Sequence, residues 1–342
     1  MHAQGGITRL APSPTGDLHL GHAFAFTANW LLARRLGWRV ILRLDDLDAP
    51  RVAAGGERAT IDDLRWLGLD WDGEPVRQSK RMKRYEAAMR ALASSGRVFE
   101  SPHSRAEVRE AAASASAPQE GQVHAVFPRS LRPVATDAWR FADTCVNHRV
   151  AVPEGPTQVH DALLGARDAD LAREHGDFLV WAKAGIPSYQ LACAVDDGEL
   201  GVTDVVRGED LLASAAAQQL LLGWLGHATP RWWHLPLVRD AGGRRLAKRD
   251  GDEGLATMRA QGVEAGRVRG LVALWLGLVP APRCLSATAL LDAADPDRLV
   301  AGARALAARG GAVVTASCAA WLRGDDASAD TLARDARGTA ST

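Results

Sequence analysis

The stretch Arg9-Leu-Ala-Pro-Ser-Pro-Thr-Gly-Asp-Leu-His-Leu-Gly-His22 decides how the rest of the chain is interpreted. Residues 7–11 are typical of a short strand, and the prolines and the glycine that follow indicate a turn. Apolar residues then recur at helical spacing over residues 22–36, and Gly37 is a natural stop for that helix. The stretch therefore predicts a turn at the mouth of a helix.

This turn carries residue types that suit an anionic ligand. The N-terminus of a helix has unpaired N–H groups and a partial positive charge, which favour phosphate. His19 and His22 can each donate a hydrogen bond to a phosphoryl oxygen, and Gly21 lets a flat ring such as adenine lie against the backbone. The alternative is that the turn is only a turn and that both histidines are surface residues, because short motif matches are hypotheses.

The composition is that of an ordinary chain with room for two domains. Of its 342 residues, 24% are charged and 47% hydrophobic, and 41 Lys and Arg balance 41 Asp and Glu. No net charge therefore draws the whole chain to nucleic acid or to a membrane, so a polyanion site has to be a local patch.

Location and redox state are also suggested by the sequence. The first residues lack a signal-peptide pattern, and the longest late apolar run, residues 271–279, is too short to span a bilayer. We therefore expect a cytoplasmic protein. The four cysteines show no C-x-x-C spacing, which argues against a disulfide framework and against a zinc site evident from sequence.

The segment after the first helix predicts a β-α-β unit that ends in carboxylates. Residues 38–44 read as a buried parallel strand that leads into Asp45-Asp46-Leu47-Asp48. Carboxylates at this end of a parallel strand could bind an ammonium group or ribose hydroxyls, or they could only form an acidic turn before the helix at 57–67. The basic run Arg77–Arg84 has the same two interpretations, a solvated helix start or a phosphate contact.

A second set of elements predicts the other half of a doubly wound, Rossmann-like α/β sheet. We expect a strand at 178–183, an acidic turn at Val195-Asp-Asp-Gly198, a strand within 201–210 and a helix at 211–225. Arg207 at a strand end can bind a carboxylate, with the Tyr189 hydroxyl beside it. From the residues alone, Tyr189 would more often be core and Arg207 a surface ion-pair partner.

Residues 240–249 predict a mobile cationic loop. Two glycines permit motion, and four of the next six residues are basic, so the loop could close over a triphosphate. Without other information it would more often be a solvated basic turn.

These patches together resemble the glutamyl class I aminoacyl-tRNA synthetases over most of the chain, to about residue 300. Asp48-Ala-Pro-Arg51 is most similar to the shortened branch of that family, which transfers glutamate to the queuosine base of tRNA(Asp). The motifs that carry the resemblance are Arg9–Gly16, His19–His22, Arg43–Asp48, Trp66–Asp72, Gln78-Ser79 and the segment Tyr189–Asp210.

The resemblance implies an ATP-dependent enzyme that forms glutamyl-adenylate, with Mg²⁺ on the phosphates. Arg9 would face the substrate side-chain carboxylate and Asp45 its α-ammonium, and Lys248 would match the mobile signature loop and stabilise the leaving pyrophosphate. The implied catalytic residues are His19, His22 and Lys248. The implied glutamate site is Arg9, Leu10, Ala11, Pro12, Ser13, Asp45, Tyr189 and Arg207, and the implied ATP site is His19, Gly21, His22 and Lys248.

The expected partners are L-glutamate, ATP and the anticodon loop of tRNA(Asp), bound by a monomer. The segment after Gly251 is short for anticodon-binding domains, which favours the shortened branch. Two alternatives remain: a truncated glutamyl-tRNA synthetase that acts on a tRNA 3′ end, and a non-catalytic tRNA-binding relative. Four residues depart from the family pattern, namely Asp45, Cys193, Arg245 and Ala247.

The predicted organisation has five parts. The family carries a zinc-binding insertion, and here Ser101, His103 and Leu131 stand where its cysteines would be. The tail is rich in Ala and Arg and has no assigned role, and we expect part of it to be disordered. The predicted ranges are 1–98 for the first half of the catalytic domain, 99–176 for the insertion, 177–250 for the second half, 251–300 for a helical extension and 301–342 for the tail.

We predict that the insertion binds no zinc, because one imidazole cannot replace the roughly four N or S ligands of a structural site. Metal analysis of the purified protein should find far less than one equivalent of zinc. A stoichiometric content would contradict this prediction.

Overall fold

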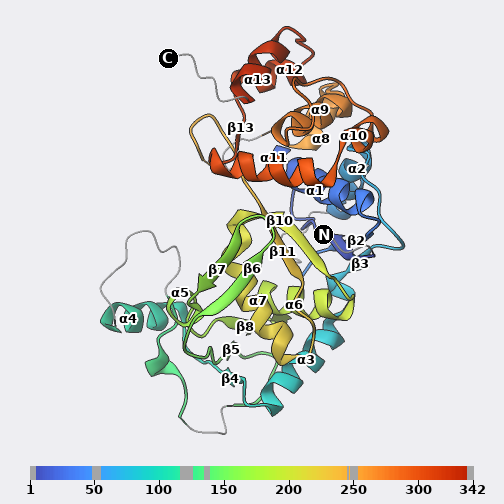
Figure 1. Ribbon diagram of the computed structural model, residues 1–342. Coiled ribbons are helices and arrows are strands. Elements are labelled where there is room, and N and C mark those ends of the chain that lie inside the picture. Colours follow the sequence, from blue (N-terminus) through green and yellow to red (C-terminus); the bar gives the residue numbers. More distant parts are fainter. Residues whose placement is uncertain are drawn as a thin grey trace.

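The computed structural model describes residues 5–47, 55–115, 126–134, 139–244, 246 and 253–336. The C-terminal helices gather at one end beside α1 and α2, and an antiparallel sheet with α4 forms the other end (Figure 1). None of the helices in these ranges is long and apolar enough to cross a lipid bilayer.

The N-terminal residues form the predicted β-α-β unit. Strand β1 (Ile7–Leu10) pairs in parallel with β2 (Arg39–Leu44), and helix α1 (Leu20–Arg35) connects them. The short strand β3 (Val76–Arg77) adds to β2 in parallel, after helix α2 (Gly56–Trp66). Strands β1 and β2 are almost wholly buried, and their buried residues include the charged Arg9 and Arg43 as well as apolar side chains.

The second half of the sheet lies beside β1. Strand β10 (Asp204–Gly208) pairs in parallel with β11 (Arg231–Leu235), and helix α7 (Leu212–Trp224) connects them. Strand β6 (Thr157–Asp161) joins β11, and β7 (Gly165–Ala169) returns antiparallel to β6. The Thr203 backbone N–H donates to the carbonyl of Ile7 at 2.9 Å, so β1 and β10 bring the two halves together. The predicted doubly wound α/β arrangement is confirmed.

A strand does form within residues 178–183, as predicted, but its predicted place in the parallel sheet was wrong. Strand β8 (Leu179–Ala182) pairs antiparallel with β5 (His148–Val150) and β9 (Ile186–Pro187), and β5 also pairs with β4 (Val98–Glu100). An alternating apolar pattern indicates a strand but not its partners, because pairing is settled by tertiary contacts.

The expected acidic turn at 195–198 was also wrong, because these residues lie inside helix α6 (Tyr189–Glu199). Ser188 caps this helix by accepting a hydrogen bond from the backbone N–H of Leu191. Asp196 and Asp197 are buried on the helix and paired with arginines. Those ion pairs stabilise a helix that a local Asp-Asp-Gly sequence disfavours.

Helix α3 (Met82–Ser94) precedes the insertion, which contains α4 (Arg105–Ala115) and the cation Arg149. The Arg149 guanidinium lies 4.1 Å from the Phe127 ring centroid and donates to the Ser101 hydroxyl at 3.3 Å. Asp177 accepts two hydrogen bonds from Arg132 at 2.7 and 2.5 Å. In the described ranges no three His, Cys, Asp or Glu side chains gather as metal ligands, and the absence of zinc stays a prediction.

The C-terminal part is folded as far as the structure describes it. In the predicted helical extension, the apolar residues Leu271, Leu274, Trp275 and Leu278 are buried. The expectation of disorder in the tail was wrong up to residue 336, because Ala-rich composition hides apolar residues such as Trp321 at helical spacing. The helices are α8 (Leu255–Ala260), α9 (Ala265–Trp275), α10 (Ala287–Ala293), α11 (Pro296–Ala308), α12 (Ala316–Leu322) and α13 (Ser328–Ala336).

Three further short elements are β12 (Val238–Arg239), β13 (Ala312–Val313) and α5 (Leu171–Glu174). Strand β13 pairs in parallel with β12, which precedes the predicted mobile loop. Helix α5 follows β7. The tail therefore packs against the segment that leads into the loop.

A buried carboxylate on α2 joins the signature turn to α8. Asp63 is 1% exposed and lies beside the backbone N–H of Leu18, and its Oδ1 lies 3.5 Å from Nη2 of Arg259 but accepts no hydrogen bond from the described residues. The backbone N–H of Leu255 also donates to the Leu18 carbonyl at 2.6 Å. Burial raises the pKa of Asp63 to about 6 from its ordinary value of 3.8, against the opposing effect of Arg259.

Because the pKa of Asp63 is higher in the folded than in the unfolded chain, the native state binds its proton more tightly and stability falls as pH rises from about 4 to about 6. Asp63→Asn removes this dependence and should raise the free energy of unfolding by about 2–3 kcal/mol at about pH 7.5, and by only about 1 kcal/mol at about pH 4.5, where the protonated form still predominates in the folded chain. Urea denaturation at both pH values measures this, with the more exposed Asp62→Asn as control. A loss of stability at the higher pH alone would contradict it.

Candidate active site

A cavity of about 580 Å³ lies where β1 and β10 meet, at the carboxyl ends of the parallel strands. This is where open α/β sheets place ligands. Leu10 is fully buried in the core and does not line the cavity. The sequence-predicted residues that do line it are Arg9, Ala11, Pro12, Ser13, His19, Gly21, His22, Asp45, Tyr189 and Arg207.

His19 and His22 form the N-terminal capping hydrogen bonds of helix α1, and their rings are in contact. The Gly21 backbone N–H donates to Nδ1 of His19 at 3.1 Å, and the His19 backbone N–H donates to Nδ1 of His22 at 3.2 Å. Their ring centroids are 3.8 Å apart. Since both Nδ1 atoms accept, this geometry assigns the proton of each neutral ring to Nε2. Each ring therefore carries its donor on the nitrogen away from the backbone.

Gly21 lies close to the His19 ring. A Cβ atom at this position would lie 3.0 Å from that ring, so a side chain here would require the capping ring to shift by a few tenths of an ångström. Sequence reasoning gave a different reason for glycine, contact with a flat ligand ring. The contact with the His19 cap is a second reason.

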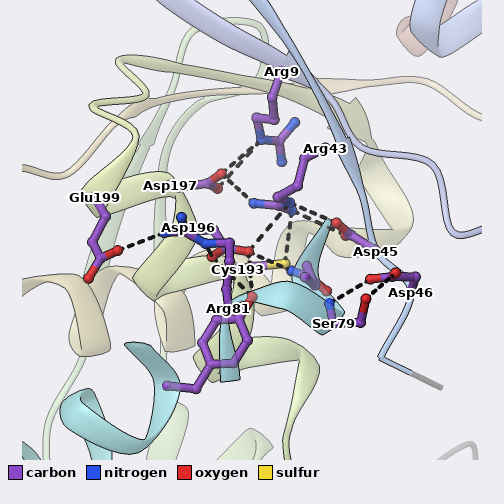
Figure 2. Close-up of polar contacts among 12 residues, drawn as sticks. Arg9, Arg43, Asp45, Asp46, Ser79, Arg81, Cys193, Asp196, Asp197 and Glu199 are labelled. Atoms are coloured by element: carbon purple, nitrogen blue, oxygen red, sulfur yellow. Dashed lines mark hydrogen bonds and ion pairs between the residues drawn. The ribbon is translucent and has the colours of Figure 1, made fainter. Parts of the chain in front are cut away.

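A buried guanidinium, Arg43, connects residues from both halves of the sheet (Figure 2). It donates to both oxygens of Asp45, at 2.7 and 3.1 Å, and to Asp197 at 2.7 Å. Asp197 also accepts from Nε of Arg9 at 3.2 Å. Arg9 and Asp45, which were expected at opposite ends of a substrate, are thus linked through Arg43 and Asp197. Burial raises the pKa of Asp45, and the Arg43 charge opposes that rise.

Two of the departures from the family pattern meet at the same group. Nη2 of Arg43 contacts the Cys193 sulfur at 3.3 Å as well as Asp45. Burial raises the pKa of the Cys193 thiol to about 12, so it stays protonated at neutral pH. Cys193 and Asp45 therefore both contact the buried Arg43 guanidinium, so a change at either position affects the same group.

Two arginines of the basic run Arg77–Arg84 form ion pairs with carboxylates of the protein itself. Arg77 pairs with Glu57, and Arg81 donates to Asp196 at 2.6 Å and to Glu199 at 2.6 Å. These two arginines therefore do not form the phosphate contact that the run suggested. The neighbouring motif residues have similar roles: Gln78 donates to Asp196 at 2.8 Å, and Ser79 donates through its backbone and hydroxyl to Asp46 at 2.7 and 2.6 Å.

Arg207 is a buried cation whose hydrogen-bond partners are all neutral. It donates to Nε2 of His234 at 3.1 Å, to the Gln218 side-chain oxygen at 2.8 Å and to the Leu211 carbonyl at 3.1 Å. Burial lowers its pKa, and within the described ranges it forms no ion pair with a carboxylate. The Tyr189 side chain, from a residue that is 41% exposed, lines the same cavity.

The predicted mobile loop begins at the cavity wall. Val238 and Leu246 line the cavity, and the Leu246 backbone N–H donates to the Val238 carbonyl at 3.3 Å. Lys248, Arg245 and Ala247 lie outside the described residues, so their roles stay predictions. Sequence reasoning missed other wall residues, Asp17 and Asp210 among them, because isolated acidic residues next to turns carry no distinctive pattern.

The chain is similar to known proteins over most of its length. Residues 7–275 match the family of class I tRNA synthetases (E and Q), catalytic domain. A protein of Nitratidesulfovibrio vulgaris named glutamyl-Q tRNA(Asp) synthetase is 38% identical over 80% of this chain and 86% of its own length. A Deinococcus radiodurans protein of the same name is 40% identical over 83% of this chain and 94% of its own.

A solved structure has the same fold. The crystal structure of a glutamate tRNA ligase from Elizabethkingia meningosepticum, in complex with its amino acid, superposes with a TM-score of 0.75 at 24% identity and covers 93% of this chain and 69% of that one. The family match and the two relatives, rather than this likeness alone, establish membership. This chain belongs to the class I tRNA synthetases (E and Q), in the family of the glutamyl-Q tRNA(Asp) synthetases.

Proposed function

We propose that the enzyme activates L-glutamate with ATP to glutamyl-adenylate and transfers the glutamyl group to the queuosine base of tRNA(Asp). The observation that carries this proposal is Arg207, a buried cation at the cavity whose hydrogen-bond partners among the described residues are neutral. A buried charge without a counter-ion is costly, and a carboxylate ligand removes that cost. Arg9, on the neighbouring strand β1, adds a second cation to the same cavity.

The glutamate would lie between the arginines and Asp45. Its side-chain carboxylate would accept hydrogen bonds from Arg207, Arg9 and the Tyr189 hydroxyl. Both Asp45 oxygens accept from Arg43, yet a carboxylate has about four lone-pair sites, so two remain for an α-ammonium group. Backbone groups of residues 10–13 would complete the site.

The triphosphate would lie against the first turn of α1. A glutamate carboxylate oxygen attacks the α-phosphorus of ATP in line, and the bond to the bridging oxygen breaks to release pyrophosphate. The Nε2–H groups of His19 and His22 can donate to phosphate oxygens as charge develops on them, and Lys248 is proposed to act on the pyrophosphate. Positioning and preorganised positive charge would supply the catalysis.

A magnesium ion would be held by the phosphates together with a carboxylate of the cavity wall. Mg²⁺ is usually held by phosphates with one or two carboxylates, and Asp17 and Asp210 lie in the wall. When bound it would neutralise part of the triphosphate charge.

The acceptor is the finer part of the proposal. The two relatives of the same name match this chain over 86% and 94% of their own lengths, which supports queuosine in tRNA(Asp). Transfer would proceed by attack of a hydroxyl oxygen of the acceptor on the acyl carbon, with release of AMP. A monomeric, cytoplasmic enzyme without zinc stays part of this proposal.

The acceptor can be identified with labelled glutamate, ATP and tRNA(Asp) that contains or lacks queuosine. We expect labelling of the queuosine-containing tRNA alone, and nuclease mapping should place the label in the anticodon fragment. Label in the 3′-terminal fragment would contradict the proposed acceptor and favour a truncated tRNA ligase. tRNA binding without glutamate-dependent exchange of pyrophosphate into ATP would instead indicate a non-catalytic relative.

A further inference from the structure

Three side chains on neighbouring strands form a chain of hydrogen bonds that ends at the cavity. Asp161 ends β6, His234 is on β11 and Arg207 is on β10. One Asp161 oxygen accepts from the backbone N–H groups of Leu163 and Leu164, both at 2.8 Å. Its other oxygen lies 2.6 Å from Nδ1 of His234, and Nε2 of His234 accepts from Nε of Arg207 at 3.1 Å.

The contacts determine the protonation state of the buried imidazole. Hydrogen bonds from His234 and backbone N–H groups keep the pKa of Asp161 below its usual value despite burial, so the carboxylate is ionised and only accepts. Nδ1 of His234 must therefore carry the proton, which leaves the lone pair on Nε2 to face Arg207. Burial lowers the pKa of His234, with Arg207 adding to that effect and Asp161 opposing it. The ring is thus neutral, with its acceptor directed at the guanidinium.

Arg207 is held on several sides. Three of its five N–H donors go to His234, Gln218 and the Leu211 carbonyl, and its guanidinium lies 5.0 Å from the Trp232 ring centroid. Two donors have no partner among the residues that the structure describes and could bind a ligand. Because the guanidinium is planar, fixing Nε fixes the plane in which those two donors lie.

We infer that Asp161 and His234 are positioning residues that orient Arg207 for the carboxylate of the amino-acid substrate. The inference deepens the proposed function and rests on it. Asp161 selects the tautomer of His234, and His234 supplies the acceptor that fixes the Arg207 plane. The pair has no contact with substrate, so its effect is on the binding of glutamate and not on the chemistry of ATP.

Variants that separate the two hydrogen bonds test this inference. In His234→Asn the shorter amide can still reach Asp161 but not Arg207, whereas in His234→Gln an amide oxygen can accept from Arg207. Leaving a buried donor unpaired should raise KM for glutamate about 10-fold or more in His234→Asn. His234→Gln should stay within about threefold of the wild type, because it restores the acceptor.

Asp161→Asn adds an independent test of the tautomer. An amide N–H at this position can donate to Nδ1 of His234, so the ring proton moves to Nε2. The Nε2–H of His234 and the Nε–H of Arg207 are then two donors that face each other without an acceptor between them. This variant should raise KM for glutamate as much as His234→Asn. Combined with His234→Gln, whose side chain has no tautomer to select, Asp161→Asn should add little.

Pyrophosphate exchange gives KM for glutamate, KM for ATP and kcat for each variant. Loss of ground-state binding predicts a higher KM for glutamate with kcat and KM for ATP changed less than twofold. The control is His160→Gln, an exposed residue next to Asp161 on β6, and thermal melting verifies that each variant folds. Arg207→Gln gives the reference for complete loss of the cation.

The exchange assay distinguishes failure of the proposed function from failure of the inference alone. A wild type without glutamate-dependent exchange overturns the proposed function and the inference with it. A wild type with normal exchange, and variants whose KM for glutamate is unchanged or whose kcat and both KM values change together, would overturn the inference alone.

Discussion

The buried guanidinium of Arg43 is the contact on which the geometry of the site depends. It binds Asp45 at the end of its own strand and Asp197 on α6, and so connects the two halves of the chain. Burying such charges is expensive, and removal of one partner from a buried pair typically costs about 3–5 kcal/mol. The network therefore favours one arrangement of the two halves, because any displacement leaves a charge unpaired.

That arrangement determines where the ligand-binding cations lie. Asp197 accepts from Arg9 as well as from Arg43, so the position of Arg9 depends on α6. Arg207 is fixed separately, through neutral partners and the Asp161–His234 pair. The charge of Arg9 is thus balanced by Asp197 inside the protein. The charge of Arg207 is not balanced by a carboxylate among the described residues, which favours binding of an anionic ligand there. The two capping histidines, at the start of α1, line the same cavity.

Much of this could be predicted from sequence where the signal is local. The strand-turn-helix at residues 7–36 was predicted because apolar periodicity and turn residues agree there, and the histidine turn, Arg9 and Arg207 all line one cavity. Other features depend on partners distant in sequence. The Asp-Asp-Gly segment became helical because Arg43 and Arg81 pair with it, and Arg81 lost its expected surface role for the same reason. Asp161, the carboxylate partner of His234, is 73 residues away in the sequence, and no short motif reveals the pair.

The central claim is that one cavity holds the amino-acid carboxylate at Arg207 and the nucleotide phosphate at the histidine cap. A crystal structure with a non-hydrolysable glutamyl-adenylate analogue tests it most directly. The account predicts the side-chain carboxylate of the analogue within hydrogen-bond distance of Arg207 and its phosphate mimic at Nε2 of His19 or His22. An analogue bound outside this cavity, or bound in it with the carboxylate away from Arg207, would contradict the account.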